Sequence, residues 1–245
     1  MLYLSRLLLN LRDRNARRDL ADVQQLHRTL LNAFPAAPDD APAREHFGVL
    51  FRPEPTPDQP LVVRVLVQST HVPDWSHLLP GYLAPPIDAR PNPAVRPVDD
   101  YDRIVTGMML RFRLRANPTQ RIGKTNTDQD EKWRGKRVDV RGDEERVAWL
   151  QRKADQSGFR LVSVRSAPEL ADVRISPQAN VIGYRRDKTE PRRMSFGAAV
   201  FEGLLEVQDV DRFRQTLNTG IGSGKAYGFG LLSIASVGEV HHERQ

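Results

Sequence analysis

Residues 108–116 read MMLRFRLRA, and this stretch decides how the chain folds. Leu110, Phe112 and Leu114 alternate with arginines, so the segment has one apolar and one basic side. A period of two residues is typical of a β-strand with one buried face. We therefore expect a strand here. Its face opposite the core carries three arginines: Arg111, Arg113 and Arg115.

The sequence after this strand alternates between helix and strand patterns. Helical spacing of apolar residues predicts helices over residues 144–156 and 210–217. Apolar runs predict four further strands, at 159–164, 173–184, 195–207 and 231–237. The second half of the chain is thus expected to be an α+β unit.

The first half repeats the scheme. Residues 2–9, LYLSRLLL, predict a buried strand, and Asp19 is a candidate N-cap for a helix over residues 20–34 that Pro35 ends. Strands are expected at 47–51 and 61–68. This β-α-β-β order is most of one ferredoxin-like unit. The predicted fold class is α+β, with two tandem ferredoxin-like (RRM-like) βαββαβ domains.

Proline marks the domain boundary. Most of the 18 prolines lie between Pro35 and Pro97, and a dense run begins at Pro80. Proline fixes φ and lacks an N–H, so this run is not expected to form regular helix or central strand. We predict a first domain at 1–83, a linker at 84–104, a second domain at 105–237 and a polar tail at 238–245. Residues 119–142, with little apolar content, predict a mobile basic loop.

Composition excludes several classes of protein. The 245 residues suffice for two domains, and 39% hydrophobic content is too high for a disordered chain. No apolar run approaches the ~20 residues that cross a bilayer. The absence of cysteine excludes disulfides, thiolate metal sites and a cysteine nucleophile. We expect a cytoplasmic protein with no membrane partner.

The net charge of +6 is concentrated in the middle of the chain. Residues 103–165 carry 16 basic and 8 acidic side chains. Such clustering favours a phosphate-bearing partner, and a solvated basic surface is the alternative on charge alone.

A glycine cluster at residues 220–230, GIGSGKAYGFG, is the first candidate site. It is no P-loop, because Thr219 stands where the first glycine belongs and Ala226 where Ser or Thr belongs. Glycines let a backbone approach its ligand and expose N–H groups to phosphates. Gly222, Gly224 and Lys225 are therefore candidate phosphate contacts; the alternative is a loop that needs positive φ for its turns.

His27 is the second candidate site. It lies on or beside the apolar stripe of the first helix, where a histidine is more often a packed core residue. Three arginines flank it, however: Arg17, Arg18 and Arg28. A histidine beside a phosphodiester can transfer protons near neutral pH. No histidine or carboxylate set has strong metal-ligand spacing, so we expect no metal and no cofactor.

Several segments together resemble the CasE-type CRISPR-associated endoribonucleases. The stretch FRLRANPT at 112–119 carries the resemblance, and further segments follow in family order over nearly the whole chain. They are YLSR at 3–6, LHRTL at 26–30, LVQS at 66–69, GKR at 135–137, WLQRK at 149–153, FEGLL at 201–205 and the glycine cluster through Ser233.

The resemblance implies two ferredoxin-like domains and an RNA substrate, the repeat hairpin of precursor CRISPR RNA. It implies metal-independent cleavage beside the hairpin by 2′-hydroxyl attack, giving 5′-hydroxyl and 2′,3′-cyclic phosphate ends. It also implies that the product stays bound among the subunits of the Cascade complex, with no small-molecule substrate. In this family the histidine at the position of His27 is the general acid/base residue. The family often has a tyrosine where this chain has Gln24, so the second proton-transfer role is open among water, Lys225, Tyr227 and His27 acting alone.

The family also inserts a basic β-hairpin into the groove of the RNA stem. Arg185, Arg186 and Lys188 match this hairpin, and without the resemblance an exposed charged turn would be preferred. Further RNA contacts are expected from the strand and the basic loop, at Arg113, Arg115, Lys136 and Arg137. The arginines that flank His27 are also expected to contact the RNA: Arg17, Arg18 and Arg28. Two alternatives to the enzyme are a non-catalytic RNA-binding subunit of the same lineage and an unrelated basic interaction protein.

Overall fold

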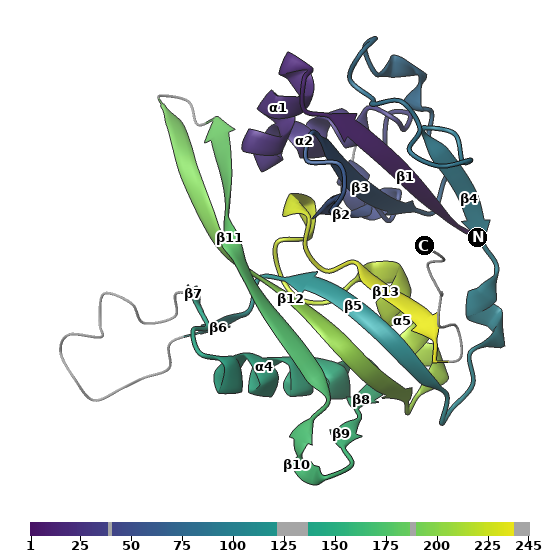
Figure 1. The fold of residues 1–245 in the computed structure, drawn as a ribbon, viewed down its shortest axis with the longest axis vertical. Helices are drawn as coiled ribbons and strands as arrows, with labels where there is room; N and C mark the ends of the chain where they lie inside the picture. Colours follow the sequence, from purple (N-terminus) through teal and green to yellow (C-terminus); the bar gives the residue numbers. More distant parts are fainter. Residues whose placement is uncertain (39–40, 122–136, 187–189, 238–245) are drawn as a thin grey trace.

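The computed structural model describes residues 1–38, 41–121, 137–186 and 190–237, and shows a mixed α+β protein built on two main antiparallel sheets (Figure 1). The first sheet has the order β2-β3-β1-β4. Its strands are β1 (Leu2–Asn10), β2 (Leu50–Pro55), β3 (Val62–Ser69) and β4 (Ala94–Val98). Leu7 of β1 lies opposite Val65 of β3, and both are fully buried under the helices of this half.

Two helices, α1 (Arg14–Ala21) and α2 (Val23–Leu31), replace the single helix expected at 20–34. Asp13 caps α1, accepting from the backbone N–H groups of residues 15 and 16. Asp22 ends α1 in an extended conformation and caps α2 through the N–H of Gln24. The prediction that Asp19 is the N-cap was therefore wrong: two other aspartates compete for backbone N–H groups and divide the segment there.

The second sheet has the order β11-β12-β5-β13, with β8 added to β12. The expected strand at 108–116 is confirmed as β5 (Met109–Ala116), with Leu110, Phe112 and Leu114 buried. Helices pack on its apolar face. The other elements of this half are α4 (Asp143–Gln156), β8 (Phe159–Leu161), β11 (Val173–Arg186), β12 (Pro191–Val207), α5 (Val210–Thr219) and β13 (Leu232–Ser236).

Shorter elements complete the described chain. The expected strand at 159–164 is divided between β8 and a short β9. Thr119–Arg121 and Arg137–Asp139 pair as β6 and β7, and the interior of the expected loop, 122–136, lies outside the described residues, as does the tail 238–245. The remaining elements are α3 (Ala43–His46), η1 (Trp75–His77), η2 (Asp100–Arg103), β9 (Ser163–Val164), β10 (Ala167–Ala171) and η4 (Lys225–Tyr227).

The segment expected as a linker, 84–104, contains β4 and therefore belongs in part to the first sheet. Val98 lies opposite Leu2 of β1, and β4 is an edge strand, where the missing N–H of Pro97 costs no ladder partner. Asn92 leads into it: its side-chain amide bonds both the N–H and the carbonyl of Leu8, at 2.9 Å each. Pairing with β1, which sequence-local reasoning does not see, makes this proline-rich stretch a strand.

Buried polar contacts join the two halves. The guanidinium of Arg52 in β2 donates to the carbonyl of Leu231 and to the hydroxyl of Ser233, both at 3.0 Å. Gln68 in β3 donates to the carbonyl of Leu217 at 2.8 Å. Within the described ranges, no helix is long and apolar enough to cross a membrane.

Candidate functional site

His27 lies on α2, between the buried core and solvent. Its neighbour Leu26 is buried, whereas His27 itself is half-buried and stacks on Phe51 of β2, with ring centroids 6.3 Å apart. The Nδ1 atom is buried and has no hydrogen-bond partner among the described protein groups. Packing against Phe51 therefore helps to hold the ring, and Nδ1 is not engaged in a hydrogen bond with the described protein groups.

The surroundings of His27 keep it neutral. Burial, together with the smaller effects of the positive charges of Arg44 and Arg28, lowers the pKa of His27 to about 4. At neutral pH the imidazole is unprotonated and able to accept a proton.

The helix that carries His27 is held in place by a buried carboxylate. Asp19 of α1 accepts from the Thr29 hydroxyl at 2.6 Å and from the Tyr82 hydroxyl at 3.0 Å. Arg18 donates twice to the same carboxylate, so this predicted RNA contact is already committed to an ion pair. The hydrogen bond between Asp19 and Thr29 therefore fixes the position of α2 relative to α1.

The glycine cluster packs against this helix. Its 3₁₀ turn η4 contacts α2 and β2. Gly228 has φ +78°, and a Cβ there would lie 3.1–3.3 Å from Pro53, Phe51 and Arg115. Glycine is thus required because the loop must come this close to the strand that supports His27.

A polar pocket of about 480 Å³ opens beside the cluster, between α4 and α5. Gly222, Lys225 and the predicted Arg137 line it, but His27 does not. Among the described lining residues there is no carboxylate, whereas five are cationic: Arg121, Arg137, Lys153, Arg212 and Lys225. Such a pocket fits phosphate groups.

Arg44 connects this pocket with His27. Burial lowers the pKa of Lys225, and the nearby charge of Arg44 adds to the shift. The same Arg44 depresses the pKa of His27. Arg44 is half-buried and pairs with exposed Glu45 at 2.6 Å. More cations than carboxylates thus lie near the imidazole.

The long hairpin of β11 and β12 runs beside the start of α2 (Figure 1). The N–H of Tyr184 donates to Asp22 at 3.1 Å, and a Cβ at Gly183 would lie 3.1 Å from Val23. Arg185 is exposed and pairs in register with Arg192. Arg186 is in the strand, its side chain outside the described part; Lys188 also lies outside it.

The other predicted RNA contacts lie in different surroundings. Arg28 is exposed on α2, whereas Arg17 donates to the carbonyls of residues 11 and 12. Arg115 lies 5.1 Å from the Phe229 ring centroid, near the glycine cluster. Arg113 forms ion pairs with Glu54 and Glu202. Lys136 lies outside the described residues.

Sequence reasoning missed four cations of this site: Arg44, Arg121, Lys153 and Arg212. Lys153 had a usable signal, because it follows Trp149 by one helical turn, and Trp149 packs on Gly222. Arg44 had none, since its helix α3 has only four residues.

Two candidates for the second proton-transfer role have defined neighbours. The Tyr227 hydroxyl donates to the sulfur of Met194 at 3.8 Å, and its ring stacks on Phe196. Lys225 faces the polar pocket. The described residues contain no group of three His, Asp or Glu side chains placed to hold a metal ion.

The fold and the site define a basic α+β protein that holds a neutral imidazole among cations beside a long β-hairpin. A protein family described as CRISPR associated protein matches residues 2–236. The chain is 39% identical to the CRISPR-associated endoribonuclease Cse3 of Thermus thermophilus, covering 96% of this chain and 100% of that protein. It is 28% identical to the Cascade subunit CasE of Escherichia coli, covering 96% and 99%.

A solved structure agrees with these relatives. The structure of Cse3 bound to a 19-nucleotide RNA superimposes with a TM-score of 0.74 at 37% identity, covering 95% of this chain and 99% of that one. The chain belongs to the CRISPR-associated family of CasE-type endoribonucleases.

Proposed function

We propose that this protein is a metal-independent endoribonuclease that cleaves precursor CRISPR RNA beside the repeat hairpin. One observation carries the proposal: the neutral imidazole of His27 lies near Arg28 and Arg44, on a helix that contacts both the turn carrying Lys225 and the β11–β12 hairpin. RNA cleavage by its own 2′-hydroxyl needs a base and cations near the scissile phosphate. The relatives named as endoribonucleases support the same activity.

In the proposed reaction His27 accepts the proton of the 2′-hydroxyl. The 2′-oxygen attacks the adjacent phosphorus, and the bond from phosphorus to the 5′-oxygen breaks. A proton from the imidazolium or from water ends on the leaving 5′-oxygen. The products carry a 2′,3′-cyclic phosphate and a 5′-hydroxyl. The cations of Arg44 and Lys225 stabilise the charge that develops on the phosphoryl oxygens.

The hairpin RNA is proposed to lie against the basic side of the site. The glycine cluster, the polar pocket and the β11–β12 hairpin are proposed to contact its phosphates, because A-form RNA is recognised mainly by shape and backbone. The residues assigned to this surface are Arg28, Arg115, Arg137, Arg185, Arg186, Lys188, Gly222, Gly224 and Lys225.

The product RNA is proposed to remain bound within a Cascade complex in the cytoplasm, as the name of the relative CasE suggests. Both halves are proposed to be ferredoxin-like domains. The order β2-β3-β1-β4, antiparallel throughout, supports this for the first half. In the second half β13, β5 and β12 take the corresponding places, and β8 and β11 share the fourth.

A second candidate function is an RNA-binding subunit that holds the hairpin without cutting it. Gln24 favours it, because an amide can hydrogen-bond but cannot transfer a proton as an acid or a base.

One experiment separates these functions. The protein is incubated with its repeat hairpin RNA in EDTA, and the product ends are identified. We expect cleavage with a 5′-hydroxyl and a cyclic phosphate, and none when the 2′-hydroxyl at the cut site is replaced by hydrogen. Cutting of the deoxy RNA would exclude the mechanism, and binding without cutting would favour the second candidate.

A further inference from the structure

A second basic surface lies on the opposite side of β2 from His27. Successive strand residues point to opposite faces, so Phe51 faces His27 and Arg52 faces away. There, between the open faces of the two sheets, is a cleft of about 580 Å³, which we call the sheet cleft. Its lining arginines are Arg6, Arg52, Arg64, Arg90, Arg96 and Arg113.

The sheet cleft has more guanidinium groups than carboxylates to neutralise them. Glu54 is buried, and three arginines share it: Arg52 at 2.7 Å, Arg64 at 3.0 Å and Arg113 at 3.5 Å. Burial lowers the pKa of Arg52, and the charges of Arg113 and Arg64 act in the same direction against the effect of Glu54. The arginines therefore repel one another across this carboxylate.

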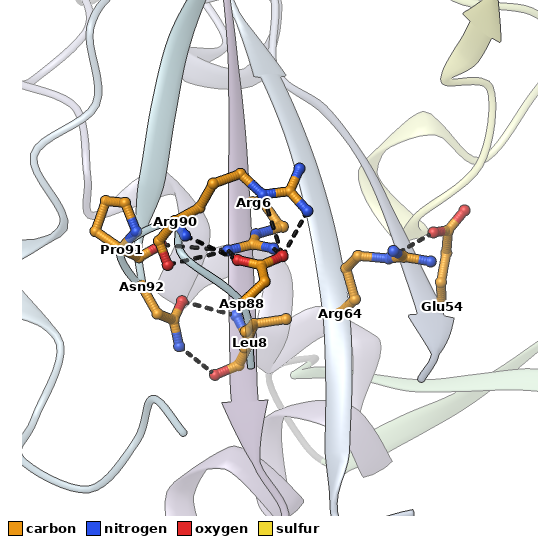
Figure 2. Close-up of polar contacts among 8 residues, drawn as sticks. All are labelled: Arg6, Leu8, Glu54, Arg64, Asp88, Arg90, Pro91 and Asn92. Carbon is orange, nitrogen blue, oxygen red and sulfur yellow. Dashed lines mark hydrogen bonds and ion pairs between the residues drawn. The ribbon is translucent and has the colours of Figure 1, made fainter. Parts of the chain in front are cut away.

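The other end of the sheet cleft shows the same excess. Arg6 and Arg90 share Asp88, as Figure 2 shows, together with the Arg64–Glu54 pair. Arg96 on β4 is exposed and has no hydrogen-bond or ion-pair partner in the described part of the chain. An anion entering here would neutralise charge that the protein leaves uncompensated.

The floor between these arginines is apolar. Leu4, Leu66, Ala94 and Val95 come from three adjacent strands of the first sheet, and Val95 is 41% exposed. Apolar strand surface next to planar guanidinium groups suits unstacked bases, while the same guanidiniums pair with phosphates. An acidic peptide would use the charge but would not need guanidinium planes beside a flat floor.

We propose that the sheet cleft binds single-stranded RNA that continues from the hairpin held at the His27 site. This rests on the proposed function, since the hairpin brings its single-stranded flanks to the protein. β2 separates the two surfaces, and a small pocket lies beside its exposed end at Pro55. This pocket is lined by Arg113, which also lines the sheet cleft, and by Arg115, which lies near the glycine cluster, so a flank that passes the end of β2 leads from one surface to the other. The sheet cleft thus adds affinity for flanked RNA and takes no part in the cleavage chemistry.

The test compares two RNAs, each with deoxyribose at the cut site to block cleavage. One is the bare hairpin, and the other carries single-stranded tails of about eight nucleotides, within the ~4–16 nucleotide range of single-strand-binding folds. We expect the tails to tighten binding about tenfold, and Arg96→Glu to remove that gain. Arg165→Glu, an exposed arginine of the β9–β10 turn, is the matched control and keeps the gain.

Three results would overturn the inference: tails that add no affinity, a gain that Arg96→Glu retains, or a gain that oligoglutamate but not oligouridylate of equal charge competes away. The last would assign the cleft to an acidic protein instead. Binding and cleavage of a bare hairpin with ribose at the cut site are measured in parallel for the wild type and for Arg96→Glu, and the two proteins are expected to agree. If the bare hairpin is neither bound nor cut by the wild type, the proposed function fails, and this failure is distinguishable from that of the cleft.

Discussion

The Asp19 carboxylate accepts a 2.6 Å hydrogen bond from the Thr29 hydroxyl, and so a fully buried charge on α1 holds the helix that carries His27. Thr29 lies two residues after His27, near the end of α2. On the other side, the His77 ring nitrogen Nε2 lies 3.0 Å from the carbonyl of Thr29. The position of the imidazole is therefore set by contacts outside the cationic site.

Asp19→Ala is expected to destabilise the protein by about 3–5 kcal/mol, because Arg18, Thr29 and Tyr82 lose a shared buried partner. Urea unfolding measures the change. Thr29→Val removes one hydrogen bond and should cost about 1–2 kcal/mol. A loss below 1 kcal/mol for Asp19→Ala would mean that the carboxylate does not hold the two helices together.

His27→Ala is expected to slow cleavage by about 10²–10⁴-fold while hairpin RNA binding is kept, as for a lost general acid or base. Single-turnover cleavage and a binding titration give the two numbers. His71→Ala serves as the control, because this exposed histidine lies outside the site and should leave both unchanged. Undiminished cleavage by His27→Ala would remove this residue from the mechanism.

Arg44→Gln should move the pH profile of cleavage. The reaction needs neutral His27, so kcat/KM of the wild type falls as pH drops toward the pKa of about 4. Removing the positive charge of Arg44 raises this pKa toward its ordinary value, and the acid limb shifts to higher pH. A single-turnover pH series measures the limb, and Arg165→Gln is the charge-matched control. An acid limb that does not move would show that Arg44 does not act on the imidazole.

The local sequence pattern correctly predicted the elements that form without help from distant residues. The alternation of Phe112 and Leu114 with arginines is enough for β5, because one buried face fixes the strand. The prediction of a single helix was wrong at Asp22, because this residue caps a new helix instead of continuing the first one. The strand β4 was not predicted, for a different reason. It forms through pairing with β1, and the proline-rich sequence of the segment gives no local indication of that partner.

The site divides in the same way. The helical stripe placed His27 at the margin of the core, and the resemblance supplied its role. The approach of Arg44 depends on the burial of Phe47, which follows α3 into the core. The sharing of Glu54 by arginines from both sheets depends on how the two halves dock, and no spacing in the sequence encodes it.

The depressed pKa of His27 also predicts how stability changes with acidity. The folded pKa of about 4 lies below the ordinary value of 6.5, so protonation favours the unfolded chain. The contribution of neutral His27 is fully present above pH 6.5 and is lost as pH falls toward 4. It is at most ~3 kcal/mol, because each pKa unit corresponds to about 1.4 kcal/mol and the ring is only partly buried.

His27→Gln should therefore flatten the loss of stability between pH 6.5 and 4, since glutamine does not titrate. Urea unfolding free energies at several pH values, compared as slopes, separate this effect from any change in packing. His71→Gln is the control and should keep the wild-type slope. If His27→Gln loses stability over this interval as steeply as the wild type, the imidazole is not held in its neutral form by its surroundings, and the assignment of His27 as the base loses its electrostatic support.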